Sequence, residues 1–138
     1  MAKLSAIKAD MRKVEEGRWE TYSAGIQLRI ASTSSIAYRR ARNDILKPYM
    51  RGTRSRAIDP DRVIELLKPA VARYLLLDWR NIEDDNGKAI KYSPEKAMEF
   101  FDDPALKDFY EFVLEVAGET DLYRQQAVAD EAKNSRTA

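Results

Sequence analysis

The 138-residue sequence contains no cysteine and no histidine. The absence of cysteine excludes disulfide bonds and thiolate chemistry. The absence of histidine removes the commonest general base and the commonest transition-metal ligand, so catalysis would depend on carboxylates, Lys, Tyr, Ser or Thr alone. We therefore expect a protein that is not an enzyme and that uses no catalytic residue, metal or cofactor.

Long apolar runs are also missing. The longest extends only from Tyr74 to Leu77, whereas a membrane-spanning helix needs about 18 or more consecutive apolar residues. The opening residues, Met1–Ser5, lack the apolar core of a secretory signal. We expect no membrane contact, a cytoplasmic location, a single domain over residues 1–132 and a disordered tail over residues 133–138.

The net charge of +1 is divided unevenly along the chain. Residues 1–70 carry 15 Lys and Arg against 8 Asp and Glu, and residues 71–138 carry 9 against 15. Such a dipole can steer nucleic acid to the basic half, or it can support self-association in which the basic half of one copy contacts the acidic half of the next. The alternative without a functional meaning is that the charges of both halves are solvated and bind no partner.

The N-terminal third combines short helical and alternating patterns. Apolar residues at helical spacing predict a weak helix or ordered arm over residues 4–14. Alternating residues around a short Gly-containing connection predict a β-hairpin over residues 18–30. Its buried face is predicted to hold Trp19, Ile26, Leu28 and Ile30.

Helix-start signals organise the rest of the chain. Ser34 or Ser35 can cap a helix that runs to about Met50, and Asp59-Pro60 begins another that runs to about Leu77. Pro69 should kink or split that second helix. Asn86-Gly87 predicts a second short hairpin near residues 79–92.

Further helices are predicted at Ser93-Pro94 and at Asp103-Pro104, the second ending at Gly118. A last helix is predicted over residues 120–132. The predicted fold class is α+β, mainly α, with a small N-terminal hairpin, the second short hairpin and about five helices.

Two charged clusters invite binding hypotheses. The acidic run from Glu83 to Gly87 suggests a calcium-binding loop that starts at Asn81. The Gly required at the sixth position comes one residue late, at Gly87, and Tyr92 occupies the twelfth position, where the final Glu ligand is required. A solvated turn is therefore favoured. A possible basic surface supplies the alternative function, a small nucleic-acid-binding regulatory protein that uses the basic region 39–56. Its residues are Arg39, Arg42, Arg51, Arg54 and Arg56. No recognised nucleic-acid-binding motif accompanies them, and nucleic acid is not the favoured partner.

Aromatic residues are concentrated in the C-terminal half. They suggest a partner-binding surface, because aromatic anchors dominate helix-in-groove binding. The competing interpretation is that all of them belong to the core. The residues are Phe100, Phe101, Phe109 and Phe112.

The run from Leu75 to Glu95 resembles the tail assembly chaperones of long-tailed bacteriophages of the siphophage type. In that family a helix leads into W-x-N-hydrophobic-acidic-x-x-G-K, which Trp79-Arg80-Asn81-Ile82-Glu83-Asp84-Asp85-Asn86-Gly87-Lys88 matches here apart from one extra residue. Asp103-Pro104-Ala105-Leu106 resembles the family's D-P-x-L, and Glu16-Gly17-Arg18-Trp19 resembles its E-G-x-W. Ser34-Ser35-Ile36-Ala37 departs from the usual N-P-x-Y. The resemblance covers roughly residues 11–135.

This resemblance implies a protein that acts in virion assembly without chemistry. Such a chaperone binds the tape measure protein, keeps it soluble while the tail is built, and is displaced as the tail tube protein polymerises. The implied partners are therefore the tape measure protein and the tail tube protein. The implied location is the cytoplasm of the bacterial host, with the protein absent from the mature virion.

Overall fold

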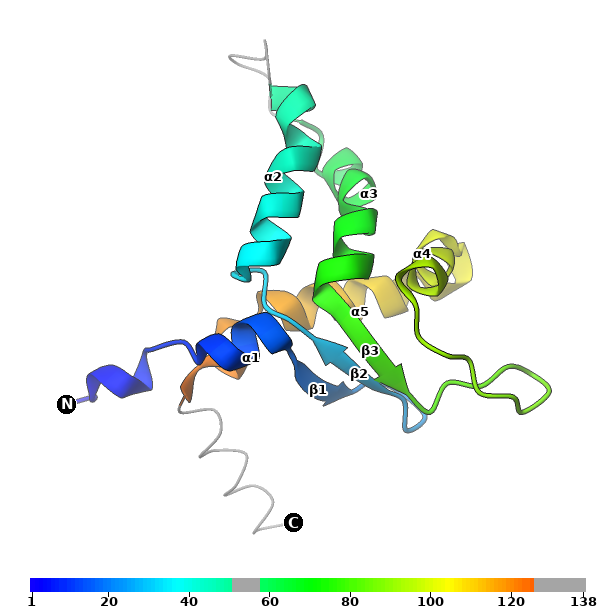
Figure 1. Cartoon of the computed structure of the whole chain (residues 1–138), viewed down its shortest axis with the longest axis horizontal. Helices are drawn as coiled ribbons and strands as arrows, with labels where there is room; N and C mark the ends of the chain where they lie inside the picture. The colour runs from blue at the N-terminus through cyan, green and yellow to red at the C-terminus, as the bar shows by residue number, and fades with distance from the viewer. Residues whose placement is uncertain (51–57, 126–138) are drawn as a thin grey trace.

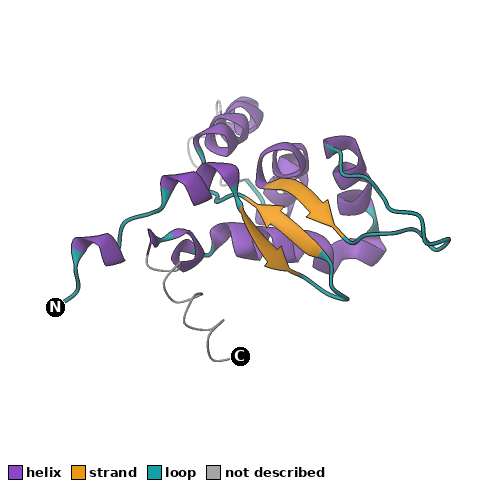
Figure 2. Cartoon of the chain, turned by 60° about the horizontal axis from the view of Figure 1, so that its bottom comes forward, coloured by secondary structure: helices purple, strands orange, loops and turns teal. Residues whose placement is uncertain are grey.

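A computed structural model describes residues 1–50 and 58–125. Its centre is a three-stranded antiparallel sheet in the order β1-β2-β3, formed by Arg18–Thr21, Gln27–Ile30 and Leu76–Arg80. Four helices gather on one side of this sheet (Figure 1; Figure 2). They are α2 (Ile36–Met50), α3 (Pro60–Ala70), α4 (Pro94–Asp102) and α5 (Lys107–Gly118). The predicted α+β class with mainly helical content is confirmed.

The N-terminal hairpin forms as predicted, but one residue faces the other way. Leu28 and Ile30 are fully buried beneath the helices. Trp19 lies opposite Arg29 in the register, so it occupies the other face of the sheet. There the guanidinium of Arg80 lies 3.7 Å from the centre of the Trp19 ring. The prediction that Trp19 shares the buried face is therefore wrong, because Trp19 pairs with Arg29 and not with Leu28 or Ile30.

The segment after Asp59 changes conformation at Pro69. The Asp59 carboxylate accepts the N–H of Asp61 and caps α3. The α-helix ends at Ala70, a π-helical turn η2 follows over Val71–Leu75, and β3 begins at Leu76. Pro69 has no N–H to complete the regular helical pattern, which agrees with the predicted split. The predicted extension of the helix to Leu77 is wrong, because Leu76 and Leu77 belong to the third strand.

The second hairpin is a small turn that extends beyond the sheet. Glu83 and Ala89 form a single bridge, and Asp84 accepts the N–H groups of Asn86 and Lys88 at 2.9 Å. Trp79, in β3, pairs with Leu28 of β2 and not with the returning arm of the turn. Its indole N–H instead donates to the Ile90 carbonyl at 2.7 Å.

The two C-terminal helices begin at the predicted caps. Ser93 accepts the N–H of Lys96 at the start of α4, and Asp103 accepts the N–H of Ala105 at the start of a short 3-10 turn η3, Pro104–Leu106. This turn leads directly into α5, and a last 3-10 turn, η4, spans Thr120–Tyr123. The continuation of the predicted last helix beyond residue 125, the tail 133–138 and residues 51–56 of the basic region lie outside the described residues.

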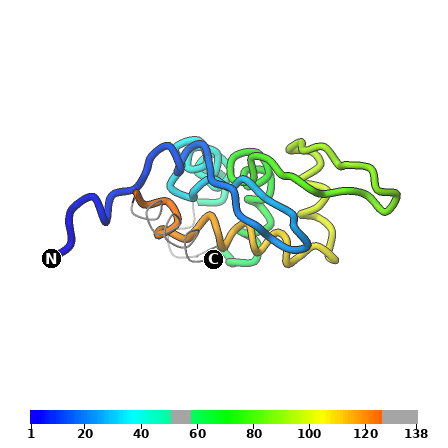
Figure 3. Tube along the Cα trace, turned by 90° about the horizontal axis from the view of Figure 1, so that it is seen from below, coloured from blue at the N-terminus to red at the C-terminus, as the bar shows by residue number. Residues whose placement is uncertain are grey.

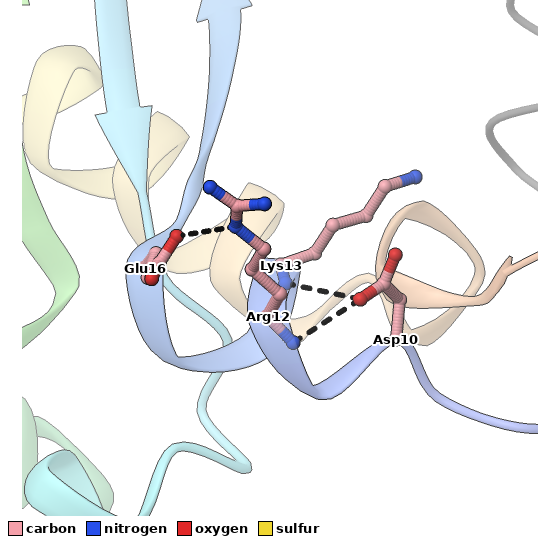
Figure 4. A network of polar contacts seen from close by, with 4 residues as sticks. All are labelled: Asp10, Arg12, Lys13 and Glu16. Atoms are coloured by element: carbon pink, nitrogen blue, oxygen red, sulfur yellow. Dashed lines mark hydrogen bonds and ion pairs between the residues drawn. The ribbon is translucent and has the colours of Figure 1, made fainter.

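The N-terminal segment is hydrogen-bonded to the last described residues of the chain. A short 3-10 turn η1 (Leu4–Ala6) precedes α1 (Met11–Glu16), which Asp10 caps by accepting the N–H groups of Arg12 and Lys13 (Figure 4). The Asp10 N–H donates to the Tyr123 carbonyl at 2.6 Å, and Gln125 N–H donates to the Lys8 carbonyl at 3.1 Å. In the described part of the chain, no helix has the length and apolar character needed to cross a membrane.

Candidate functional site

A groove of about 830 Å³ lies between α3, the α4–η3 junction and α5. Two helices line it with the same spacing i, i+3, i+4 and i+7, which places four side chains along one helical face. From α3 these are Asp61, Ile64, Glu65 and Lys68. From α5 they are Lys107, Tyr110, Glu111 and Leu114. The α4–η3 junction adds four more lining residues, Phe101, Asp102, Asp103 and Pro104.

The floor of the groove is apolar and firmly held. Phe101 and Tyr110 are each only 4% exposed, and their ring centres lie 4.6 Å apart. The Tyr110 hydroxyl donates to the Ile64 carbonyl at 3.0 Å, and burial raises the pKa of this hydroxyl. The Ile64 side chain itself is 43% exposed. It is therefore the aliphatic group of the floor that a ligand can reach most easily.

The rim of the groove is acidic. Five carboxylates face two ammonium groups, a net charge of −3. Lys68 is largely buried and pairs with Glu65 at 2.8 Å and with Asp102 at 3.5 Å. The hydrogen bond to Glu65 raises the pKa of the Lys68 ammonium group. The arrangement suits a ligand that combines an apolar stripe with positive flanks.

The four candidate phenylalanines do not form one exposed surface. Phe101 forms part of the groove floor, whereas Phe109 is 4% exposed and lies inside the core. Phe100 stacks on Trp79 with ring centres 5.0 Å apart, and Phe112 packs 4.8 Å from Tyr22. The burial of Phe101 and Phe109 contradicts an exposed-anchor role for these two in this conformation. A binding role for the half-buried Phe100 and Phe112 stays a prediction.

The possible basic surface is only partly described. Arg39 is exposed on α2, while Arg42 is half-buried and donates to the side chain of Asn43 at 3.3 Å. Arg51, Arg54 and Arg56 lie outside the described residues. The acidic run at residues 83–87 is a turn stabilised by Asp84, and the described residues contain no group of three or more acidic side chains arranged to hold a metal ion.

Sequence reasoning missed the groove, although a signal for it was present. Its two helices repeat one pattern, with a charged residue at the first and third positions of each stripe and an apolar residue at the second. That pattern predicts two faces of similar character. Their proximity depends on the tertiary fold.

Comparison with known proteins connects the chain to phage. The family model described as YdaY prophage protein matches residues 31–134, which include all the residues that line the groove. No curated protein and no solved structure gives a match. Because the family model covers well over half of the chain, the protein belongs to the YdaY prophage protein family and is of phage origin.

Proposed function

We propose that this phage-derived protein is a tail assembly chaperone that binds the tape measure protein and keeps it soluble during tail assembly. The observation that carries the proposal is the groove between α3, η3 and α5, which combines an apolar floor with a charged rim. Grooves of this kind receive amphipathic helices. A tape measure protein is expected to be a long and partly apolar helix, which is a ligand of that class.

The shape of the groove favours a helix as the ligand. The stripes on α3 and α5 each extend over two helical turns, so apolar contacts are available along the groove and not at one point only. A ligand helix with apolar side chains at i, i+3 or i+4 could place them against Ile64 and Leu114.

The charge of the groove favours a particular class of segment. The net negative rim would attract Lys and Arg residues that flank the apolar stripe of the ligand and would repel acidic helices. We therefore propose that the bound segment of the tape measure protein is helical, apolar along one face and basic at the edges of that face.

The supporting elements fit a binding protein. The Trp79–Gly87 run that resembles tail assembly chaperones serves packing and turn formation here. Asn81 adopts a positive φ of 66°, and its side-chain amide NH2 donates to the Gly25 carbonyl at 3.0 Å. Gly87 supplies the other positive φ, 81°, in the turn. These residues stabilise the body that presents the groove, a role in which no chemistry is needed.

Co-expression with the tape measure protein encoded by the same prophage tests the proposal. We expect the wild-type chain to increase the soluble fraction of the tape measure protein and to co-purify with it. Ile64→Asp should abolish both effects. Ile36→Asp is the matched control, because Ile36 is 49% exposed on α2 and is not among the residues that line the groove.

Circular dichroism and thermal unfolding of both variants establish that they fold. If Ile64→Asp does not fold, the rim variant Asp61→Lys/Glu111→Lys replaces it, since both side chains are exposed. Equal solubility of the tape measure protein with and without the chain would overturn the proposal. Binding of a labelled oligonucleotide instead, lost on Arg39→Glu, would favour the nucleic-acid alternative.

A further inference from the structure

The N-terminal arm, residues 1–8, carries large apolar side chains that the described part of the chain leaves exposed. Leu4 is 65% exposed and Ile7 is 63% exposed, and Met11, at the start of α1, is 54% exposed. They are spaced three and four residues apart along a segment that forms the 3-10 turn η1 at Leu4–Ala6 and is extended at Asp10, just before α1. Three large apolar groups in one short segment are more than the scattered exposure that a soluble surface usually shows.

The arm also carries positive charge. Lys3 and Lys8 are both exposed, and in the sequence they stand next to Leu4 and Ile7. The arm therefore has the composition that the groove requires, exposed apolar side chains with ammonium groups next to them. The groove offers the complementary composition, with Ile64 on its floor and a net charge of −3 around it.

The arm and the α4–η3 junction that lines the groove lie on different sides of one molecule. Hydrogen bonds from Asp10 to Tyr123 and from Gln125 to Lys8 fix the base of the arm beside η4. From there the arm extends away from the body, while α4 lies toward the opposite side of the molecule, beside the turn that follows β3 (Figure 1; Figure 3). An arm and a groove placed in this way can bind each other between two molecules.

We propose that the N-terminal arm of one copy occupies the acidic groove of a second copy. The contact is heterologous, because an arm meets a groove, so each copy keeps a free arm or a free groove for another contact. The result is head-to-tail association. The regulatory part of this inference rests on the proposed function, in which the groove binds a helix of the tape measure protein. The arm would then regulate the groove by covering it until that helix displaces the arm.

Sedimentation equilibrium of the full chain, without any tape measure protein, tests the association. We expect the average mass of the wild-type chain to rise with concentration and to fall as salt is added, because ions screen the rim charges. The arm variant Leu4→Asp/Ile7→Asp and the groove variant Asp61→Lys/Glu111→Lys should each remain monomeric. The control Glu83→Lys/Asp85→Lys makes the same charge change on an exposed turn and should associate like the wild type.

Mixing the two defective variants gives the decisive result. The groove variant still has a functional arm, and the arm variant still has a functional groove. An equimolar mixture should therefore form heterodimers and nothing larger. A wild-type chain that stays monomeric at every concentration, variants that associate like the wild type, or a mixture that stays monomeric would each overturn the inference. Normal association together with failed capture of the tape measure protein would overturn the proposed function alone.

Discussion

The Tyr110 hydroxyl donates a hydrogen bond of 3.0 Å to the carbonyl of Ile64, and so joins α5 to α3 beneath the groove. The two residues are 46 positions apart in the sequence. The aromatic ring of the same Tyr110 also contacts the ring of Phe101. The floor of the groove is thus part of the core, and the relative position of its two walls depends on this contact.

Removing that hydroxyl should weaken the floor without opening a cavity. Tyr110→Phe keeps the ring and loses one hydrogen bond, which should lower the free energy of unfolding by about 1 kcal/mol. Urea denaturation measures the change. Tyr22→Phe is the control, because the Tyr22 ring packs against Phe109 and Phe112 and the substitution preserves that packing. Equal losses in the two variants would argue against a specific role for the Tyr110 bond.

Substitutions at Phe101 and Ile64 should affect different properties, the first mainly stability and the second mainly binding. Phe101 is 4% exposed, so Phe101→Ala should cost roughly 3–5 kcal/mol through lost packing and a residual cavity. Ile64 is 43% exposed, so Ile64→Ala should cost no more than about 1 kcal/mol while it reduces capture of the tape measure protein. Thermal unfolding and co-purification measure the two effects. A Phe101→Ala protein that melts like the wild type would contradict its assignment to the core.

Gly17 and Gly25 offer a matched pair, since φ is positive at both, 81° and 77°. A Cβ at Gly17 would lie 3.0 Å from the Ile30 carbonyl carbon, whereas a Cβ at Gly25 would meet nothing within 4 Å. Both Ala variants bear the conformational cost of about 1 kcal/mol, and only Gly17→Ala adds a clash with backbone that must shift. Chemical denaturation should therefore show the larger loss for Gly17→Ala. Equal losses in the two variants would show that the β2 backbone shifts at little cost.

Features with local causes could be predicted from the sequence. The starts of α3 and α4 and of η3 follow from an Asp or Ser cap with Pro next to it, because the cap bond closes within three residues. The turn around Gly87 follows from Asn-Gly for the same reason. In each case the residues that decide the structure are neighbours in the chain.

Features with distant causes could not be predicted. The pairing of β3 with β2 joins Trp79 to Leu28, and no local pattern marks that partner. The face of Trp19 depends on which residue of β2 lies opposite, and a shift of one residue reverses it. The groove requires α3 and α5 to meet, although the stripe on each helix is visible in the sequence. The arm could be recognised as weakly helical, but its exposure depends on what the folded body leaves uncovered.

The last prediction concerns alkaline pH and Tyr92. The Tyr92 hydroxyl shares its one proton between the carbonyls of Ala72 and Leu76, and so ties the segment before α4 to the π-helical turn and to β3. Burial, with a smaller contribution from Asp78, raises the pKa of Tyr92 from the ordinary value of 10.0 to about 12. In this pH range the unfolded chain loses the phenolic proton first and the folded chain keeps it. Stability from this group is therefore fully present below pH 10.0 and is lost as the pH rises toward 12.

We expect the free energy of unfolding to fall between these two pH values and the tyrosinate absorbance of Tyr92 to develop near the upper one. Tyr92→Phe should be less stable at neutral pH, because both carbonyls lose a donor, and its stability should fall less steeply across the alkaline range. Some slope should remain, since burial also raises the pKa of Tyr110 and Tyr123. An unchanged slope in Tyr92→Phe would show that Tyr92 titrates alike in the folded and unfolded chains, and that its hydroxyl is open to water.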